Sequence, residues 1–448
     1  MEFCKSYSQH FIMPGMNSVN HAVDYLSGLL GTQRRKNIET IENDVSGSDY
    51  QGMEQFISSS PWNHQEVMDH VAKDANDWIG DPVETGFFVD ESSFIKKGKC
   101  SVGVKRQYAG RIGKIENCQV GVFGCLGKGR QYAVTDFDLY LPEEWALDTE
   151  RCNKAKIPEE NQTYRPKWKI ALDMVRHART TGLEFGYVGC DSLYGDTAPF
   201  INALEDDGEY FMADVKKAKH VWLSEPLIDS PDSDSEGRGR PRKNAKLHDD
   251  NDAVSMTVEN LVNSLGDEEF EVIAFRQGDK GKVCGRFWMA KVWHWDKRES
   301  KARMRQLIVR KDADGSIKYS LTNLPTGRPL KYYAAIQGQR FWIEQAFHES
   351  KSQLGMAQYQ VRVWSGWHHH ITLVCMALLF AGKYKQEVCE EVPLLTTRDI
   401  TELLAFYLPR RNHTEAEVHE QIRKRHQQRQ ADIDRRRLQK TGLPEGFN

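Results

Sequence analysis

The sequence has little that would indicate a secreted or membrane protein. Its most apolar stretch, Ile371 to Ala381, is far too short to cross a bilayer. Residues 1–20 carry charged and polar side chains throughout, without the apolar centre of a signal peptide. The nine cysteines stand singly and none forms a Cys-x-x-Cys pair, which argues against a zinc ribbon and a disulfide framework. We expect a cytoplasmic protein with reduced thiols.

The sequence also lacks a net excess of positive charge. The formal net charge is -3 at pH 7, so the molecule as a whole is not a polycation. Binding to a polyanion must therefore depend on local basic surface. The segment from Arg410 to Lys440 contains ten Lys and Arg residues against five Asp and Glu. It is expected either to bind phosphates or to form a solvated, flexible tail.

Hydrophobic periodicity divides the 448 residues into five regions. Apolar residues recur at helical spacing near the N-terminus, and strand-like runs begin at Glu84. The predicted regions are 1–80, a small helical domain; 81–216, alternating strands and helices; 217–335, rich in strands; 336–390, helical; and 391–448, a charged helical tail. Within the third region, the polar loop from Asp229 to Asp252 has a composition typical of disorder.

The second region has a recognisable order of elements. The expected strands are 86–90, 119–126, 130–141, 184–190 and 210–215, with helices at 167–180 and 197–204. This order, βββαβαβ, is that of a ribonuclease-H-like sheet, a mixed sheet with helices on both faces. The strand-rich region 217–335 interrupts it, and helical pattern returns from Ala334 to about Gln353 and from Trp364 to Tyr384.

Two of these strands are expected to end on an acid, Asp90 and Asp191. Sites in α/β sheets usually lie beyond strand ends, and a buried carboxylate without a partner is costly. Mg²⁺ prefers oxygen ligands, and two such ions can assist an in-line phosphoryl displacement. Either Asp alone is as readily explained by a turn or a helix cap.

A third candidate acid lies on a helix between two basic residues. Arg340, Glu344 and Lys351 are four and seven residues apart, which places them on one helix face. A metal ligand beside groups that hold DNA phosphates would have this arrangement. A solvated face with ion pairs is the alternative.

These motifs together resemble those of insertion-sequence transposases of the DDE superfamily, in the group with a Tyr-x2-Arg-x3-Glu-x6-Lys signature. The signature stands here as Gln337, Arg340, Glu344 and Lys351, with Gln337 replacing the Tyr. The acids stand in Phe88-Val89-Asp90-Glu91-Ser92-Ser93 and in Gly189-Cys190-Asp191-Ser192-Leu193-Tyr194-Gly195. The resemblance extends from about Tyr25 to Tyr384.

The resemblance implies a ribonuclease-H-like catalytic core with a β-rich insertion before the last acid. It implies catalysis by Asp90, Asp191 and Glu344 with two Mg²⁺ ions, for which Mn²⁺ substitutes, and phosphate contacts by Gln337, Arg340 and Lys351. The implied partners are double-stranded DNA, as transposon terminal repeats and target, and a second copy of the chain. When bound to DNA, the protein would lie at the nucleoid.

In related transposases the insertion helps to process a DNA hairpin, and an aromatic side chain there can stack on a flipped base. Such stacking contributes ~1–3 kcal/mol per base. The candidates are Trp288, Trp293 and Trp295, of which the last two would share a strand face. Packing in the core of the sheet is the favoured alternative for all three.

Other residues near the predicted site have competing interpretations. Glu349 is the reserve third acid, and Asp196 is a candidate cap for the helix starting at Thr197. Asp136 and Asp138 share a strand face with Tyr140 and are candidates for a place near the site, although a solvent face is the favoured interpretation. Glu91 is expected to point away from Asp90 if the strand continues. For His348, proton transfer and a surface or DNA-backbone role remain open. Adjacent side chains on a helix do not converge on one ion, so His368, His369 and His370 indicate polar packing or DNA contact rather than a metal site.

Several basic groups are candidates for binding DNA. In the tail, the basic residues are densest in two runs, Arg423-Lys424-Arg425 and Arg435-Arg436-Arg437. Lys96, Lys97, Lys99, Lys105 and Arg106 follow the first acid. The N-terminal region, with Arg34, Arg35 and Lys36, is the best candidate for reading the transposon end. A catalytically silent DNA-binding regulator derived from a transposase is the alternative function. A ribonuclease-H-like nuclease is a third, against which the large insertion argues.

Overall fold

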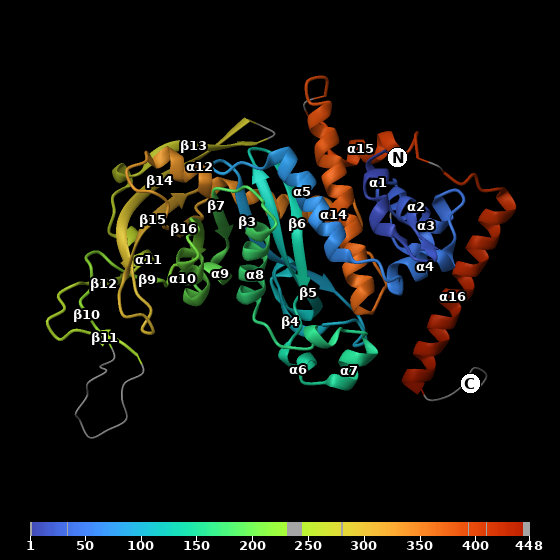
Figure 1. Ribbon diagram of the computed structural model, residues 1–448, viewed down its shortest axis with the longest axis horizontal. Coiled ribbons are helices and arrows are strands. Elements are labelled where there is room, and N and C mark those ends of the chain that lie inside the picture. Colours follow the sequence, from blue (N-terminus) through green and yellow to red (C-terminus); the bar gives the residue numbers. More distant parts are fainter. Residues whose placement is uncertain are drawn as a thin grey trace.

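A mixed sheet of twelve strands organises the part of the chain that the structure describes (Figure 1). The computed structural model describes residues 2–33, 35–230, 244–278, 281–392, 394–408 and 410–441. Strands and helices of the chain's second, third and fourth predicted regions meet at this one sheet. The expected α/β class is confirmed.

The central strands run β6 (Gln131–Leu139), β5 (Lys114–Lys128), β3 (Gly86–Ile95), β7 (Tyr187–Cys190) and β8 (Phe211–Val215). β6, β5 and β3 are antiparallel, whereas β3, β7 and β8 are parallel. β4 (Lys105–Ala109) pairs with the beginning of β5. The elements follow the predicted order, with β4 as an extra strand.

One boundary prediction was wrong: β3 does not end at Asp90. It continues to Ile95 because residues 91–95 remain paired with β5, from Glu91 opposite Val122 to Ile95 opposite Cys118. The pattern was misleading because Ser92 and Ser93 are polar yet buried. Asp90 therefore lies in the middle of a strand, where its backbone is fixed by hydrogen bonds on the sheet.

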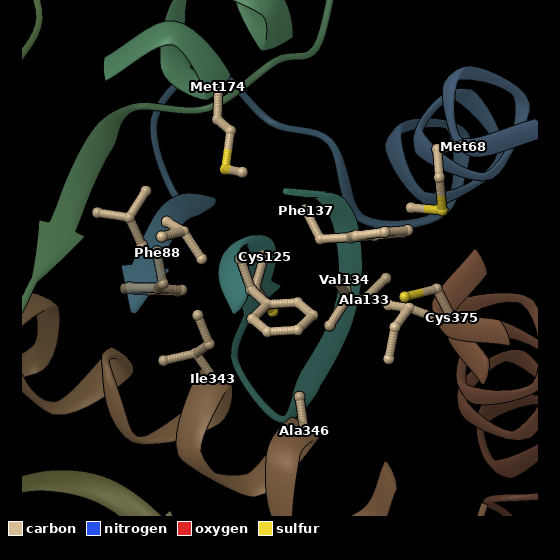
Figure 2. Close-up of a cluster of buried hydrophobic side chains, with 14 of the residues drawn as sticks. Met68, Phe88, Cys125, Ala133, Val134, Phe137, Met174, Ile343, Ala346 and Cys375 are labelled. Atoms are coloured by element: carbon tan, nitrogen blue, oxygen red, sulfur yellow. The ribbon is translucent and has the colours of Figure 1, made fainter. Parts of the chain in front are cut away.

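Helices cover the central strands on both faces. α8 (Lys167–Thr180) lies on one face and α13 (Phe341–Ser352) on the other, so that Met174 and Ile343 point at the strands from opposite sides (Figure 2). α5 (His64–Ile79) and α14 (Trp364–Glu387) close the core beside β6 (Figure 2). Burial of these apolar faces is the main force that holds the layers together.

The N-terminal helices join the same hydrophobic core as the sheet. They are α1 (Glu2–Ser6), α2 (Val19–Leu29), α3 (Ile38–Asp44) and α4 (Tyr50–Ser58). α14 packs against α2, α4 and α5 through its histidines. The His369 ring nitrogens lie 2.8 and 3.0 Å from the carbonyls of Ile57 and Trp62, and His370 Nδ1 lies 2.8 Å from the Tyr25 hydroxyl. The interpretation of these histidines as polar packing is confirmed.

The β-rich region extends the central sheet. β16 (Ile317–Thr322) pairs with β8, and the sheet continues through β15 (Arg303–Lys311), β14 (Gly281–His294), β9 (His220–Trp222) and β12 (Ser255–Thr257), with β13 (Glu271–Gly278) on β14. A second, smaller apolar cluster lies here, including Val221, Val292 and Leu307. Residues 231–243 of the expected disordered loop lie outside the described residues. Its flanks, expected to share the disorder, instead pair as β10 (Ile228–Asp229) and β11 (Lys246–Leu247).

The remaining elements are short or peripheral. The charged tail is helical as expected, in α15 (Thr397–Leu404) and α16 (Glu415–Thr441), and Gln421 Nε2 donates to Asn43 Oδ1 at 3.1 Å. Others are β1 (Ile12–Met13), β2 (Met16–Asn17), α6 (Glu143–Ala146), α7 (Thr149–Lys154), α9 (Ser192–Gly195), α10 (Ala198–Asp206), α11 (Val258–Asn263) and α12 (Leu330–Gln339). Within the described residues, every helix is too short or too polar to cross a membrane.

Candidate active site

Three aspartates occupy equivalent positions along the three parallel strands: Asp90 and Asp214 lie within β3 and β8, and Asp191 directly follows the end of β7. The register pairs Val89 of β3 with Cys190 at the end of β7, and Cys190 with Ala213 of β8. The next residue in each chain segment is Asp90, Asp191 or Asp214. Neighbouring strands are about 4.8 Å apart, and equivalent positions face the same side of a sheet. The sheet thus gathers the acids into one row.

The guanidinium of Arg340 lies over this row. Its Nε is 3.1 Å from Asp214 Oδ2, its Nη1 is 3.5 Å from Asp90 Oδ2, and its Nη2 is 2.8 Å from Glu344 Oε1. Arg340 is the residue at which α12 ends and α13 begins. The junction of the two helices therefore places the Arg340 guanidinium within reach of the carboxylates of Asp90, Asp214 and Glu344.

The carboxylates of the row repel one another in a poorly solvated place. Burial and the nearby Asp191 raise the pKa of Asp90 well above its ordinary value, and Arg340 opposes this. Burial and Glu91 likewise raise the pKa of Asp191. Burial would lower the pKa of Arg340, but Asp214, Asp90 and Glu344 raise it. The row holds more negative charge than Arg340 compensates, which is the electrostatic condition for binding a further cation.

Glu344 lies in the first turn of α13, at the open edge of this cluster. Its side chain is 49% exposed and pairs with Arg340, and His348 is exposed one turn further along. No three His, Cys, Asp or Glu side chains among the described residues are already arranged around a metal position. The oxygen donors nevertheless fit a hard divalent cation, since Asp90 and Glu344 both converge on the positive charge of Arg340.

Asp214 was missed by the sequence analysis, although a signal was present. Its strand reads Phe-Met-Ala-Asp, an apolar run followed by an acid, like the runs before Asp90 and Asp191. Asp214 Oδ1 accepts from Ser320 Oγ at 2.6 Å, and Ser320 Oγ accepts from Gln337 Nε2 at 2.8 Å. Gln337 is buried, so its expected contact with DNA phosphate is wrong; its amide instead supports Asp214.

A cleft with a volume of about 790 Å³ opens beside the row. Asp191, Asp214 and Arg340 line it together with the basic side chains of Lys216, Lys217 and Lys318. Lys217 pairs with Glu259 at 3.0 Å, whereas burial, Arg310 and Arg340 lower the pKa of Lys318. A cleft that is acidic at one end and basic along its wall suits a phosphodiester whose reacting phosphorus approaches the acids.

The other candidate acids are occupied elsewhere. Glu349 accepts from Lys385 at 2.9 Å and from Thr397 Oγ1 at 2.5 Å, away from Arg340, which favours a structural role for it. Asp196 does not cap α10; its carboxylate accepts from the backbone N–H of Lys216. Glu91 turns to Lys167 of α8 at 3.2 Å, as strand alternation predicts, but it stays close enough to Asp191 to raise the pKa of that carboxylate.

Asp136 and Asp138 are not on a solvent face. Asp136 is buried and its Oδ2 lies 3.0 Å from His177 Nδ1, while Asp138 pairs with Arg165 and lies 3.4 Å from His368 Nε2. These contacts join β6 to α8 and α14. Both acids thus have structural partners, and neither faces Arg340.

Some predicted DNA contacts are buried, and others remain accessible. Lys36 is buried and donates to the backbone carbonyls of Leu29 and Gln353, so its expected role in DNA contact is wrong. Lys96 lies over the Tyr359 ring, and Lys351 Nζ donates to Ser93 O at 3.0 Å. Arg35, Lys97, Lys99, Arg106, Arg423 and Lys424 are exposed, and Lys105 pairs with Glu144. Arg34 and the side chain of Arg425 lie outside the described residues.

The three tryptophans occupy different environments. Trp288 packs against the second apolar cluster, in agreement with a core role. Trp293 stands opposite Trp222 in the sheet, and Lys291 Nζ lies 4.7 Å from its ring centre. Trp295 lies beyond the end of β14, with Nε1 donating to Glu299 O at 2.9 Å, so the expected strand face shared with Trp293 is wrong.

Comparison with known proteins places this geometry in context. Residues 13–282 match a family model described as DDE superfamily endonuclease; this segment contains all three aspartates and ends before Glu344. Over 233 residues the chain is 28% identical to a probable transposase for insertion sequence element IS701 from Microchaete diplosiphon, covering 50% of this chain. The match spans 55% of that relative's length. A cryo-EM structure of a piggyBac transposase synaptic complex with hairpin DNA aligns over 91% of this chain and 76% of its own, at 10% identity and a TM-score of 0.42.

Proposed function

The chain belongs to the DDE superfamily endonucleases, and from this we propose that it is a DNA transposase. It binds the ends of its element, cleaves the DNA and transfers the 3' ends to a target. The catalytic residues are Asp90, Asp191 and Glu344. The single observation that carries the proposal is the row of aspartates aligned by β3, β7 and β8, which meets Arg340 at the start of α13 and Glu344 in its first turn.

The core that holds these residues is ribonuclease-H-like. The order β6-β5-β3-β7-β8, antiparallel on one side of β3 and parallel on the other, supports this assignment. Asp90 lies on the central strand β3, Asp191 directly follows β7 and caps α9, and Glu344 joins them from a helix. Rigid elements suit a reaction that requires reacting groups to be held in fixed geometry.

Each side chain has a task that its surroundings permit. Asp90, Asp191 and Glu344 would hold two divalent cations, Mg²⁺ or Mn²⁺, which when bound supply an activated oxygen nucleophile and stabilise the leaving oxygen. Lys216, Lys217 and Lys318 line the cleft for the DNA backbone. Arg340 and Lys351, on the same helix face as Glu344, orient the phosphate next to the reacting one.

The remaining regions have supporting tasks in this proposal. Residues 1–80 recognise the transposon end, and the tail with Arg423 and Lys424 adds non-specific phosphate contacts. The region 217–335 is an insertion that handles the excised strand ends, with Trp293 as the aromatic placed next to a cation. Two copies of the chain are required because two ends must be brought together.

The test is cleavage of DNA carrying the terminal repeats that flank the element, with Mg²⁺ and the full chain. We expect Asp191→Ala to abolish cleavage and to retain end binding. The control is Asp196→Ala. Asp196 is an acid near the same cleft, and its carboxylate pairs with Lys216 and Lys219. Unchanged cleavage by Asp191→Ala contradicts the assignment. Tight end binding without metal-dependent cleavage by the unmodified protein supports the regulator instead.

A further inference from the structure

Side chains of two other elements hold both oxygens of Asp214. Its Oδ1 accepts from Ser320 Oγ at 2.6 Å and its Oδ2 accepts from Arg340 Nε at 3.1 Å. Asp90, by contrast, accepts from the backbone N–H of its own neighbour Glu91 at 2.7 Å, and its side-chain partner is Arg340, at 3.5 Å. The row of three equivalent aspartates therefore contains two kinds of carboxylate, distinguished by their partners.

The orientation of Asp214 is fixed from the interior of the protein. Ser320 is fully buried on β16 and receives the Gln337 amide at 2.8 Å, and Gln337 is buried on α12. Gln337 lies one helical turn before Arg340. The end of α12 is thus attached to Asp214 twice, once through Gln337 and Ser320 and once through Arg340 itself.

Arg340 stands where positive charge is needed for Asp90 and Glu344. We propose that Arg340 and a divalent cation exchange on Asp90 and Glu344, and that Asp214 is the positioning residue that retains Arg340 during this exchange. The inference rests on the proposed function, since it concerns the metal that function requires. When the cation binds, the Nη atoms of Arg340 leave Asp90 and Glu344, while its Nε stays on Asp214.

If this exchange occurs, substitutions of Arg340 and of Asp214 should change the affinity for a divalent metal in opposite directions. Arg340→Gln removes a competing cation, so a divalent metal binds more tightly. Asp214→Asn keeps an oxygen for Ser320 but removes the charge that retains Arg340, so Arg340 rests more fully on Asp90 and Glu344 and the metal binds more weakly. In a chain that lacks Arg340, Asp214→Asn should have little effect on metal affinity, because Asp214 acts on the metal only through Arg340.

The experiment measures binding of Mn²⁺ alone to the full-length chain, by electron paramagnetic resonance of the free ion and without DNA. We expect Arg340→Gln to bind Mn²⁺ at least about threefold more tightly than the wild type and Asp214→Asn at least about threefold more weakly. The loss caused by Asp214→Asn should be at least about threefold smaller in the Arg340→Gln background. Asp196→Asn, a carboxylate near the same cleft without contact to Arg340, reports the effect of lost charge alone. The melting temperature of each variant verifies folding.

Two results would overturn the inference. One is weaker Mn²⁺ binding by Arg340→Gln, which would make Arg340 a support rather than a competitor. The other is a loss from Asp214→Asn that shrinks by less than about threefold in the Arg340→Gln background, which would make Asp214 a direct ligand. Failure of the proposed function is distinguishable, because Asp191→Asn would then leave Mn²⁺ binding unchanged.

Discussion

The two faces of α13 each carry a glutamate, and the charges of these two glutamates are compensated differently. Glu349 faces the seam with α14 and α15, where both of its oxygens lie 2.9 Å from Lys385 Nζ and one also accepts from Thr397. Burial would raise the pKa of Glu349, but Lys385, Thr397 and Tyr132 lower it. Glu344, five residues earlier, is half-exposed and shares its cation with Asp90 and Asp214. A structural acid has its charge compensated locally, whereas the acids proposed for catalysis do not.

The difference extends beyond one helix. At the seam of α14 with α2 and α4, His369 and His370 find backbone or hydroxyl partners. In the row of aspartates, burial and like charge destabilise the ionised forms. Functional sites commonly retain such destabilising arrangements, because binding energy from a ligand offsets them.

Exchanging each glutamate for glutamine gives the largest contrast. Glu344→Gln should reduce cleavage by roughly 10³-fold or more and change the free energy of unfolding by less than about 1 kcal/mol, because its ion pair is half-exposed. Glu349→Gln should destabilise the fold by roughly 2–4 kcal/mol, because it leaves Lys385 without its partner. Chemical denaturation and cleavage per folded molecule separate the two effects. If both variants lose cleavage equally per folded molecule, the distinction between a catalytic Glu344 and a structural Glu349 is contradicted.

Stability without metal should respond to pH in opposite directions in the two regions. The folded-state pKa of Asp90 is raised, so its contribution is present at acidic pH and is lost as the pH rises through that pKa. Burial lowers the pKa of His369 to about 4 and that of His370 to about 3. Unfolded histidines take up protons below about pH 6.5, so the seam loses stability as the pH falls from there toward 3.

Melting temperatures between pH 4 and pH 9 test this opposition. Asp90→Asn should lose less stability than the wild type on the alkaline side, and His370→Gln should lose less on the acidic side. Each variant serves as the control for the other. Identical profiles for the wild type and both variants would show that neither region sets the pH dependence.

Cations along the cleft should have the smallest individual effects. Lys217→Ala should weaken DNA binding uniformly across sequences and reduce the salt slope of log affinity by about 1, because one phosphate contact is lost. Lys154→Ala, in α7 and outside the regions proposed to contact DNA, is the matched control, because Lys154 is exposed and pairs with Glu150 as Lys217 pairs with Glu259; it should leave the slope unchanged. If Lys217→Ala leaves the salt slope unchanged, this wall of the cleft does not contact the DNA backbone.

The sequence was sufficient to predict the elements of the core and the helical region around Glu344, but the single helix expected from Ala334 to about Gln353 is divided at Arg340 into α12 and α13. Strand runs, turn glycines and helical spacing are local signals, and they identified the order of strands before Asp191. Local signals did not reveal that β3 continues beyond Asp90, because pairing with β5 keeps Ser92 and Ser93 in a strand. They also did not separate Lys36, which is buried against two carbonyls, from an exposed basic residue.

What the sequence determined by itself is which residues carry charge and on which periodic element they lie. It supplied Asp90, Asp191 and Glu344 as candidates, and Arg340 at the spacing that lets it reach Glu344. Only the tertiary structure decided which charges are compensated. Strand register aligned Asp214 with the other aspartates. Packing of α13 placed Glu349 in an ion pair with Lys385, whereas Glu344 pairs with Arg340, which it shares with other carboxylates. Register and packing join residues far apart in the chain, and an electrostatic interaction depends on that distance in space rather than on separation in sequence.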